Sequence, residues 1–481
     1  MPLVRRLAAR KAGLTSLASR ALSTAVSTQL AQNLESVPPT YITTLENGLR
    51  IATQATNFPT ATLGVYVDAG ARFEGPGSYG AANMIEHLLF RGSTTKSGAE
   101  IAEKLANIGV RASLSSSREV VALNSRFLAA DLDKVLPTIA DVVVNPKFND
   151  AEVDAEKDII FRQIQAQNQN YRDWILDILH SNGFTGTPLQ NGLFGFTDSV
   201  LGLSAQDLQS YHSTNWISGK TVIVGVGPIN HGHLVELVQK QFGQMPSSPS
   251  GPVPYTGPSR FTSASMEYRD DTLPMCYVGV GWEGLAAGDP RNNALEVIKS
   301  IIGSFNRTRQ PIGDHGLHFI NEIGQAPRFE GQHRVFDFDF FNINYRDNGM
   351  FGAYLACEEA DWVPANTLKA FFHELCRLTL SPTEEEVHVG RELAKTRLVA
   401  ADTSAGSDVL AASIGKDILY TGDRLPLAAR IRAIDAVSTS AVSSLLDELF
   451  YDEMCAMAMV GKTEQLPSLQ MLNQWTTRWL L

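Results

Sequence analysis

The segment Tyr79–Gly92 reads "YGAANMIEHLLFRG" and carries an acid and an imidazole side by side, Glu86 and His87. Along a helix of about 3.6 residues per turn, Asn83, Glu86 and His87 fall on one side. The opposite side collects the apolar residues Met84, Ile85, Leu88 and Leu89. The segment is therefore expected to form an amphipathic helix with a narrow polar stripe above an apolar core.

The polar stripe lacks one residue of a metal-binding pattern. If position 83 were His, the segment would read H-x-x-E-H, in which two imidazoles bind zinc and the Glu activates a water molecule. Asn83 stands there instead. Taken alone, the stripe is explained better as a solvated or internally satisfied helix face than as a metal site.

Length and composition narrow the class of protein. The chain of 481 residues is too long for one ordinary domain, so two or more cores are expected. Hydrophobic residues make up 44% and charged residues 19%, which is typical of a globular protein. The net charge of −11 argues against nucleic-acid binding, and no run of about 18 apolar residues predicts a membrane span. The four cysteines form no CxxC pair and are expected to be buried and reduced.

The first 34 residues have a different composition from the rest of the chain. They contain five Arg or Lys residues and no acid, which is typical of a mitochondrial presequence, with a basic surface helix as the alternative. The segment Arg20–Thr24, "RALST", resembles a matrix-peptidase site and predicts a cut after Leu22. Removing residues 1–22 leaves 35 basic and 51 acidic residues, a net charge of −16.

A proline-rich segment divides the remaining chain into two parts of similar length. Pro246–Pro258, "PSSPSGPVPYTGP", holds five prolines and two glycines and is expected to be an extended linker. The two parts share landmarks that are 234 residues apart, in the pairs Val153 and Val387, Ser204 and Ser438, and Gly227 and Gly461. One offset in separate blocks argues for an internal duplication. The first landmark lies in an acidic helix of each part, for which Asn149 and Ser381 are the candidate N-caps.

Strand patterns complete the prediction of the fold. Phe336–Phe340, "FDFDF", alternates as a strand does, and Asn47-Gly48 predicts a hairpin turn. Together with the helices they predict an α+β fold of two homologous α/β sandwich domains, each a mixed, largely antiparallel sheet with helices on one face. The predicted division is a presequence and mature N-terminal segment at 1–34, a domain at 35–245, a linker at 246–262 and a domain at 263–481.

Three segments together resemble a known family. They are "DAGARFEGPGSYGAANMIEHLLFRG", "NPKFNDAEVDAEKDIIFRQIQ" and "TLENGLRIATQ". They resemble the mitochondrial processing peptidase and cytochrome bc1 core protein family, the M16 inverted zinc peptidases. The resemblance runs from about Pro38 to the C-terminus, and duplicated halves are a property of that family.

The resemblance assigns roles to single positions. In active members two His of the helix and a distal Glu bind zinc, and the Glu of the helix is the general base. The matching positions here are Asn83 and His87 for the helix ligands, Glu86 for the base and Gln163 for the distal ligand, on a helix that also carries Glu156. Because amides are weak zinc ligands, the site is predicted to be degenerate, with no metal or cofactor and with Glu86 idle.

Other histidines offer no substitute set of ligands. His315 and His318 lack accompanying Cys or carboxylate motifs, and "HELCR" ends in Arg377 where HExxH needs His. His231 and His233 alternate along the chain. All of these residues are expected to be structural or solvent-facing.

The block at 342–358, "NINYRDNGMFGAYLACE", resembles the catalytic (β) subunit of the processing peptidase. A sequence of this β type with a degenerate metal site implies a structural function. The resemblance implies a non-catalytic core subunit (core protein 1) of ubiquinol–cytochrome c reductase, respiratory complex III, on the matrix side of the mitochondrial inner membrane. Its partners would be a core protein 2-like subunit, cytochrome b, cytochrome c1 and the Rieske subunit. Two alternatives stay open: a β-type processing peptidase subunit, catalytic or helper, and a matrix protein that holds cationic presequences without cutting them.

Overall fold

The computed structural model describes residues 37–249, 257–308, 335–358, 363–403, 406–464 and 466–477. The predicted presequence with its cut after Leu22, and residues 250–256 of the predicted linker, lie outside these ranges. Within the described part of the chain, no helix combines the length and the apolar character needed to cross a membrane.

The first half builds a six-stranded mixed sheet. Its strands lie in the order β1 (Tyr41–Thr44), β2 (Arg50–Gln54), β6 (Thr221–Val226), β3 (Thr60–Val67), β5 (Val121–Leu128) and β4 (Arg111–Ser116). Only β2 and β6 pair in parallel, and all other neighbours are antiparallel. The predicted Asn47-Gly48 turn joins β1 to β2, with Gly48 at φ 87°, a conformation that glycine adopts without strain.

The second half repeats this arrangement. Its strands lie in the order β7 (Ser265–Arg269), β12 (Ala456–Gly461), β8 (Met275–Gly284), β11 (Gly349–Glu358), β10 (Val335–Asn344) and β9 (Ser304–Asn306). The parallel pair is β7 with β12, in the position of β2 with β6. The predicted "FDFDF" strand is part of β10. The two sheets differ at one edge. In the second sheet β9 pairs with the outer edge of β10, whereas β4, the counterpart of β10, is the last strand of the first sheet.

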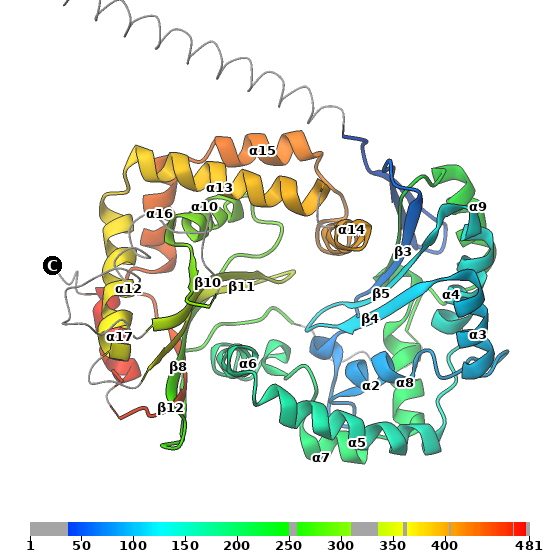
Figure 1. The fold of residues 1–481 in the computed structure, drawn as a ribbon, viewed down its shortest axis with the longest axis horizontal. Coiled ribbons are helices and arrows are strands. Elements are labelled where there is room, and N and C mark those ends of the chain that lie inside the picture. Colours follow the sequence, from blue (N-terminus) through cyan, green and yellow to red (C-terminus); the bar gives the residue numbers. More distant parts are fainter. Residues whose placement is uncertain are drawn as a thin grey trace, which may run out of the picture.

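Helices pack against both sheets (Figure 1). In the first half they are α2 (Ala81–Leu88), α3 (Gly98–Ile108), α4 (Leu132–Val144), α5 (Asp150–Gln167), α6 (Tyr171–Gly183), α7 (Thr197–Gly202), α8 (Ala205–Asn215) and α9 (His231–Phe242). In the second half they are α10 (Asn292–Ile302), α12 (Val363–Leu380), α13 (Glu384–Thr403), α14 (Ser407–Thr421), α15 (Leu427–Asp435), α16 (Thr439–Leu449) and α17 (Leu469–Thr477). The predicted α+β class with two largely antiparallel sheets is confirmed.

The two halves exchange one helix each, which the sequence analysis did not predict. Helix α6, from the first half, packs on β8 and β12, where Ile175 and Leu179 join a buried cluster with the second sheet. Helix α14, from the second half, packs on β3 and β6, where Ile414 and Ile418 meet Tyr66 of the first sheet. Figure 1 shows both helices between the sheets. Each sheet therefore has its own helices on one face and a helix of the other half on the second.

Candidate functional site

Helix α2 starts at a glycine and is capped by a remote carboxylate. Gly80 is the N-cap residue, with φ 89°, and has no side chain to cap the helix. The carboxylate of Glu74 accepts hydrogen bonds from the N–H groups of Gly80, at 2.8 Å, and Ala82, at 2.9 Å. Burial raises the pKa of Glu74 to about 8, although both hydrogen bonds oppose this rise. The start of the helix is thus fixed by buried contacts.

The apolar side of α2 is buried as predicted, but its polar side is not all solvated. Asn83 is 2% exposed, and its Nδ2 has no hydrogen-bond partner among the described residues. Glu86 and His87 are partly exposed. The first ligand position of the family motif is therefore an amide enclosed within the protein.

Glu86 is bound to the edge of the first sheet. Its Oε2 accepts hydrogen bonds from both the N–H and the Oγ of Ser116, each at 2.7 Å. Ser116 is the last residue of β4, which has no further strand beside it in the described structure. The carboxylate thus satisfies a backbone donor at an open sheet edge.

His87 lies between two side chains of α5. Its Nε2 is 3.1 Å from Oε1 of Gln163, and its Nδ1 is 3.3 Å from Oε2 of Glu156. Glu156 also pairs with Arg91, one helical turn beyond His87. The structure therefore brings His87, Gln163 and Glu156 together; the closeness of His87 and position 163 is what the family resemblance implies. The partners Arg91 and Ser116 were missed, because Arg91 lies in the turn after α2 and Ser116 on a strand, where spacing within the helix does not reveal them.

These residues do not fit a zinc ion. Zinc sites in proteins are built from imidazole, thiolate and carboxylate ligands, and here the two other ligand positions are amides. Both ring nitrogens of His87 already face α5 side chains. Across the described ranges, no group of three or more His, Cys, Asp or Glu residues has the arrangement of a metal site.

The other candidate histidines have structural partners. The ring of His231 contacts Oγ1 of Thr43 and Oγ1 of Thr53, each at 2.8 Å. His233 contacts the exposed Asp133 at 2.8 Å. Arg377 bonds the carboxylates of two glutamates in the second half. His315 and His318 lie outside the described residues.

Two hollows lie near the α2–α5 contact. A cavity of about 740 Å³ lies between the halves, and its walls include Ser115 of β4 and Ser117 just after it, Gln163 of α5, Tyr345 after β10 and Lys416 of α14. A second hollow of about 980 Å³ is bounded by His87 and by the loop 92–99. An extended segment that entered the first cavity would pass the open edge of β4 and the α2–α5 contact.

The fold and this helix define a peptidase-related class. Residues 50–196 match the model of insulinase (peptidase family M16), and residues 202–393 match that of the peptidase M16 inactive domain. The chain belongs to the M16 peptidase family, which confirms the resemblance seen in the sequence.

Within that family, the chain is similar to two mitochondrial proteins. Cytochrome b-c1 complex subunit 1 of Homo sapiens is 32% identical over 91% of this chain and 89% of its own length. The mitochondrial-processing peptidase subunit beta of Bos taurus is 30% identical over 94% of this chain and 90% of its own length. A chain of complex III2 from Candida albicans, with Inz-5 bound, has the same fold, with a TM-score of 0.76, 22% identity and coverage of 91% and 100%.

Proposed function

We propose that this chain is a non-catalytic core subunit of respiratory complex III, of the core protein 1 type, on the matrix side of the mitochondrial inner membrane. Its partners are then a core protein 2-like subunit, cytochrome b, cytochrome c1 and the Rieske subunit. The similarity to a cytochrome b-c1 complex subunit supports this proposal. The likeness to a complex III chain, at 22% identity, shows only that the two chains share a fold.

The observation that carries the proposal is the state of the α2–α5 contact. Two of three ligand positions are amides, and His87, the remaining ligand, is hydrogen-bonded into α5. Without a metal ion, nothing in this set lowers the pKa of a water molecule toward neutrality. Glu86, in the position of the general base, is bound to Ser116 of β4. These residues hold elements together and have no nucleophile to activate.

Separation of native complexes tests the proposal. Inner membranes from cells that express the tagged chain are solubilised, and the complexes are resolved without denaturation. We expect the chain to migrate with cytochromes b and c1. Migration apart from both cytochromes, with a processing-peptidase partner or alone, would contradict the core-subunit proposal. A tagged soluble matrix protein carried through the same procedure shows how much protein associates nonspecifically with the solubilised membrane complexes.

A second candidate function is that of a β-type processing peptidase subunit. It is favoured by the retained Glu86 and His87 and by the open edge of β4, because an extended peptide can add a strand to such an edge. Presequence cleavage by the purified chain with its partner, lost on Glu86→Gln, would support it. Binding of a presequence without cleavage, outside any membrane complex, would instead indicate the third alternative, a presequence-holding matrix protein.

A further inference from the structure

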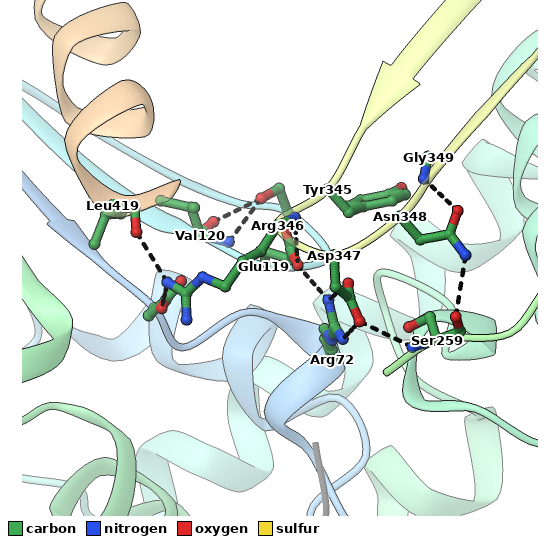
Figure 2. Close-up of polar contacts among 12 residues, drawn as sticks. Arg72, Glu119, Val120, Ser259, Tyr345, Arg346, Asp347, Asn348, Gly349 and Leu419 are labelled. Atoms are coloured by element: carbon green, nitrogen blue, oxygen red, sulfur yellow. Dashed lines mark hydrogen bonds and ion pairs between the residues drawn. The ribbon is translucent and has the colours of Figure 1, made fainter. Parts of the chain in front are cut away.

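The turn between β10 and β11 reaches from the second half into the first. Its residues 345–348 read "YRDN". The hydroxyl of Tyr345 is 2.7 Å from Nε2 of His180 on α6. Arg346 pairs with the carboxylate of Asp68, which follows β3. Figure 2 shows the turn with Arg72, Glu119 and Leu419 around it.

The next residue of the turn, Asp347, makes a bidentate ion pair with Arg72. Both carboxylate oxygens of Asp347 accept from the guanidinium of Arg72, each at 2.6 Å. The Ser259 N–H, from the end of the predicted linker, donates to the same carboxylate at 2.8 Å. Burial opposes ionisation of Asp347, but these hydrogen bonds outweigh it and lower its pKa. Asn348 adds a bond from its Nδ2 to the carbonyl of Ser259 at 3.0 Å.

The charges that the turn meets are buried in the first half. Glu119 and Asp68 are each 2% exposed, and Arg72 is 5% exposed. Arg72 pairs with two acids, with Asp347 of the turn and with Glu119 of the first half at 2.5 Å. Burial raises the pKa of Asp68, and Arg346 partly offsets this. The turn thus supplies Arg346 as a cation for Asp68 and Asp347 as a second anion for Arg72, so its withdrawal leaves the buried Asp68 without its ion-pair partner and Arg72 paired with Glu119 alone.

The same turn also contacts both exchanged helices. His180 belongs to α6, and the carbonyl of Leu419, which accepts from Arg346 at 3.1 Å, belongs to α14. Tyr345 and His180 also line the cavity of about 740 Å³ between the halves. The contacts that hold the turn therefore lie where the two sheets, the two exchanged helices and the cavity meet.

We propose that residues 345–348 form a latch that holds the two halves in one closed arrangement around this cavity. While the latch is engaged, α6 and α14 stay seated on their opposite sheets and the cavity keeps a fixed shape. Releasing the latch frees the two helices and the cavity together and leaves each sheet intact. This inference does not depend on membership of complex III.

Hydrogen exchange of the purified full chain tests the latch. The variants Asp347→Asn and Arg346→Gln each remove one charge of the turn. In both, we expect amide exchange in α6, α14 and the turn to accelerate by about tenfold or more, while β3 and β8 keep their protection. The matched control is Arg291→Gln, which breaks exposed pairs with Asp289 and Glu448 and should leave exchange in all these segments unchanged.

Two results would overturn the proposal. Unchanged exchange in α6 and α14 would mean that apolar packing alone holds the halves together. An equal acceleration over both sheets would mean that the turn supports general stability. If a charge variant does not fold, Tyr345→Phe removes the hydrogen bonds of the hydroxyl to His180 and Arg118 but leaves both charges of the turn in place, and it should give a smaller acceleration in the same segments.

Discussion

An imidazole whose two nitrogens already contact a carboxylate and a carboxamide is poorly placed to bind a metal ion. His87 faces Glu156 through Nδ1 and Gln163 through Nε2, so a metal ion would have to displace a side chain of α5. A carboxylate at position 163 and an imidazole at position 83 would change this balance, because both are strong zinc ligands. The amides at these two positions therefore decide the chemistry of the site.

Restoring both ligands should restore metal binding. We expect the double variant Asn83→His, Gln163→Glu to bind zinc more than about 100-fold tighter than the parent chain, because it regains two strong ligands. Equilibrium dialysis with metal analysis measures the difference. Adding His87→Ala to the double variant should abolish the gain. Stoichiometric zinc bound to the parent chain at His87 would contradict the prediction of a degenerate site.

A buried histidine should make stability depend on pH. Burial lowers the pKa of His212 from 6.5 to about 4, against the opposing hydrogen bond to the carbonyl of Val143. Between these values the unfolded chain binds a proton that the folded chain does not. The free energy of unfolding should therefore fall as the pH falls from 6.5 to 4, by up to about 1.4 kcal/mol per pH unit for this group.

A substitution isolates this contribution. His212→Gln should reduce the slope of the unfolding free energy against pH, measured with urea between pH 4.5 and 7. The reduction should correspond to the uptake of up to one proton fewer on unfolding. Thr214→Ser provides the control, because it changes a buried residue of the same helix that does not titrate and should leave the slope as it is in the parent chain. Identical slopes for His212→Gln and the parent would contradict the prediction.

Much of the candidate site could be predicted from residue spacing. The stripe of Asn83, Glu86 and His87 follows from helical periodicity. That His87 lies near position 163 of α5 was implied by the resemblance to the M16 family, not by periodicity. The enclosure of Asn83 and the bond from Glu86 to Ser116 could not be predicted in this way. They depend on which strand lies beside the helix, and spacing within one element carries no information about its neighbours.

At the scale of elements, the 234-residue offset has structural counterparts. Helices α5 and α13 begin at Asp150 and Glu384, and α8 and α16 begin at Ala205 and Thr439, each pair 234 residues apart. Ser204 and Ser438 both cap their helices through the side chain.

One predicted cap was wrong. Asn149 caps α5, but its counterpart is Thr383, whose Oγ1 accepts from the Glu386 N–H at 3.2 Å. The Thr383 N–H donates in turn to the Glu386 carboxylate at 3.0 Å, which completes a capping box. Ser381 lies two residues too early. The offset applied to Asn149 gives 383, so this residue could have been found from the sequence.

Alanine substitutions separate the two candidate caps. Thr383→Ala should lower the free energy of unfolding by about 1 kcal/mol, because it leaves the Glu386 N–H without its acceptor. Ser381→Ala, at an exposed position outside the helix, should change it by less than about 0.5 kcal/mol. Denaturant unfolding measures both variants. Equal effects of the two substitutions, or a larger effect of Ser381→Ala, would contradict the assignment.

At the scale of the whole molecule, the exchange of α6 and α14 was not predictable from the sequence. Each helix carries the apolar residues that any packed helix needs, and these residues do not specify which sheet they will cover. The contact is nonetheless specific. The ring of Tyr66, on β3, lies against Gly415 of α14, where a Cβ would overlap the ring.

This contact predicts an unusual effect of a helical glycine. Gly415→Ala should destabilise the protein by about 1–3 kcal/mol, because overpacking against Tyr66 outweighs a helix-propensity gain of up to about 1 kcal/mol. Thermal unfolding measures the change. Gly202→Ala, at the end of α7 with open space around it, is the control and should be neutral or slightly stabilising. A gain in stability from Gly415→Ala would show that α14 does not seat on Tyr66.

The exchange of helices also sets an order of events for a chain that emerges from its N-terminus onward. The face of the first sheet that α14 covers holds Ala52, Val222 and Val224, all fully buried in the finished protein. Its cover ends at Thr421, nearly two hundred residues after the last strand of that sheet. A chain released stepwise from a ribosome or a translocation pore therefore exposes an aggregation-prone apolar surface until most of its length has left the ribosome or the pore.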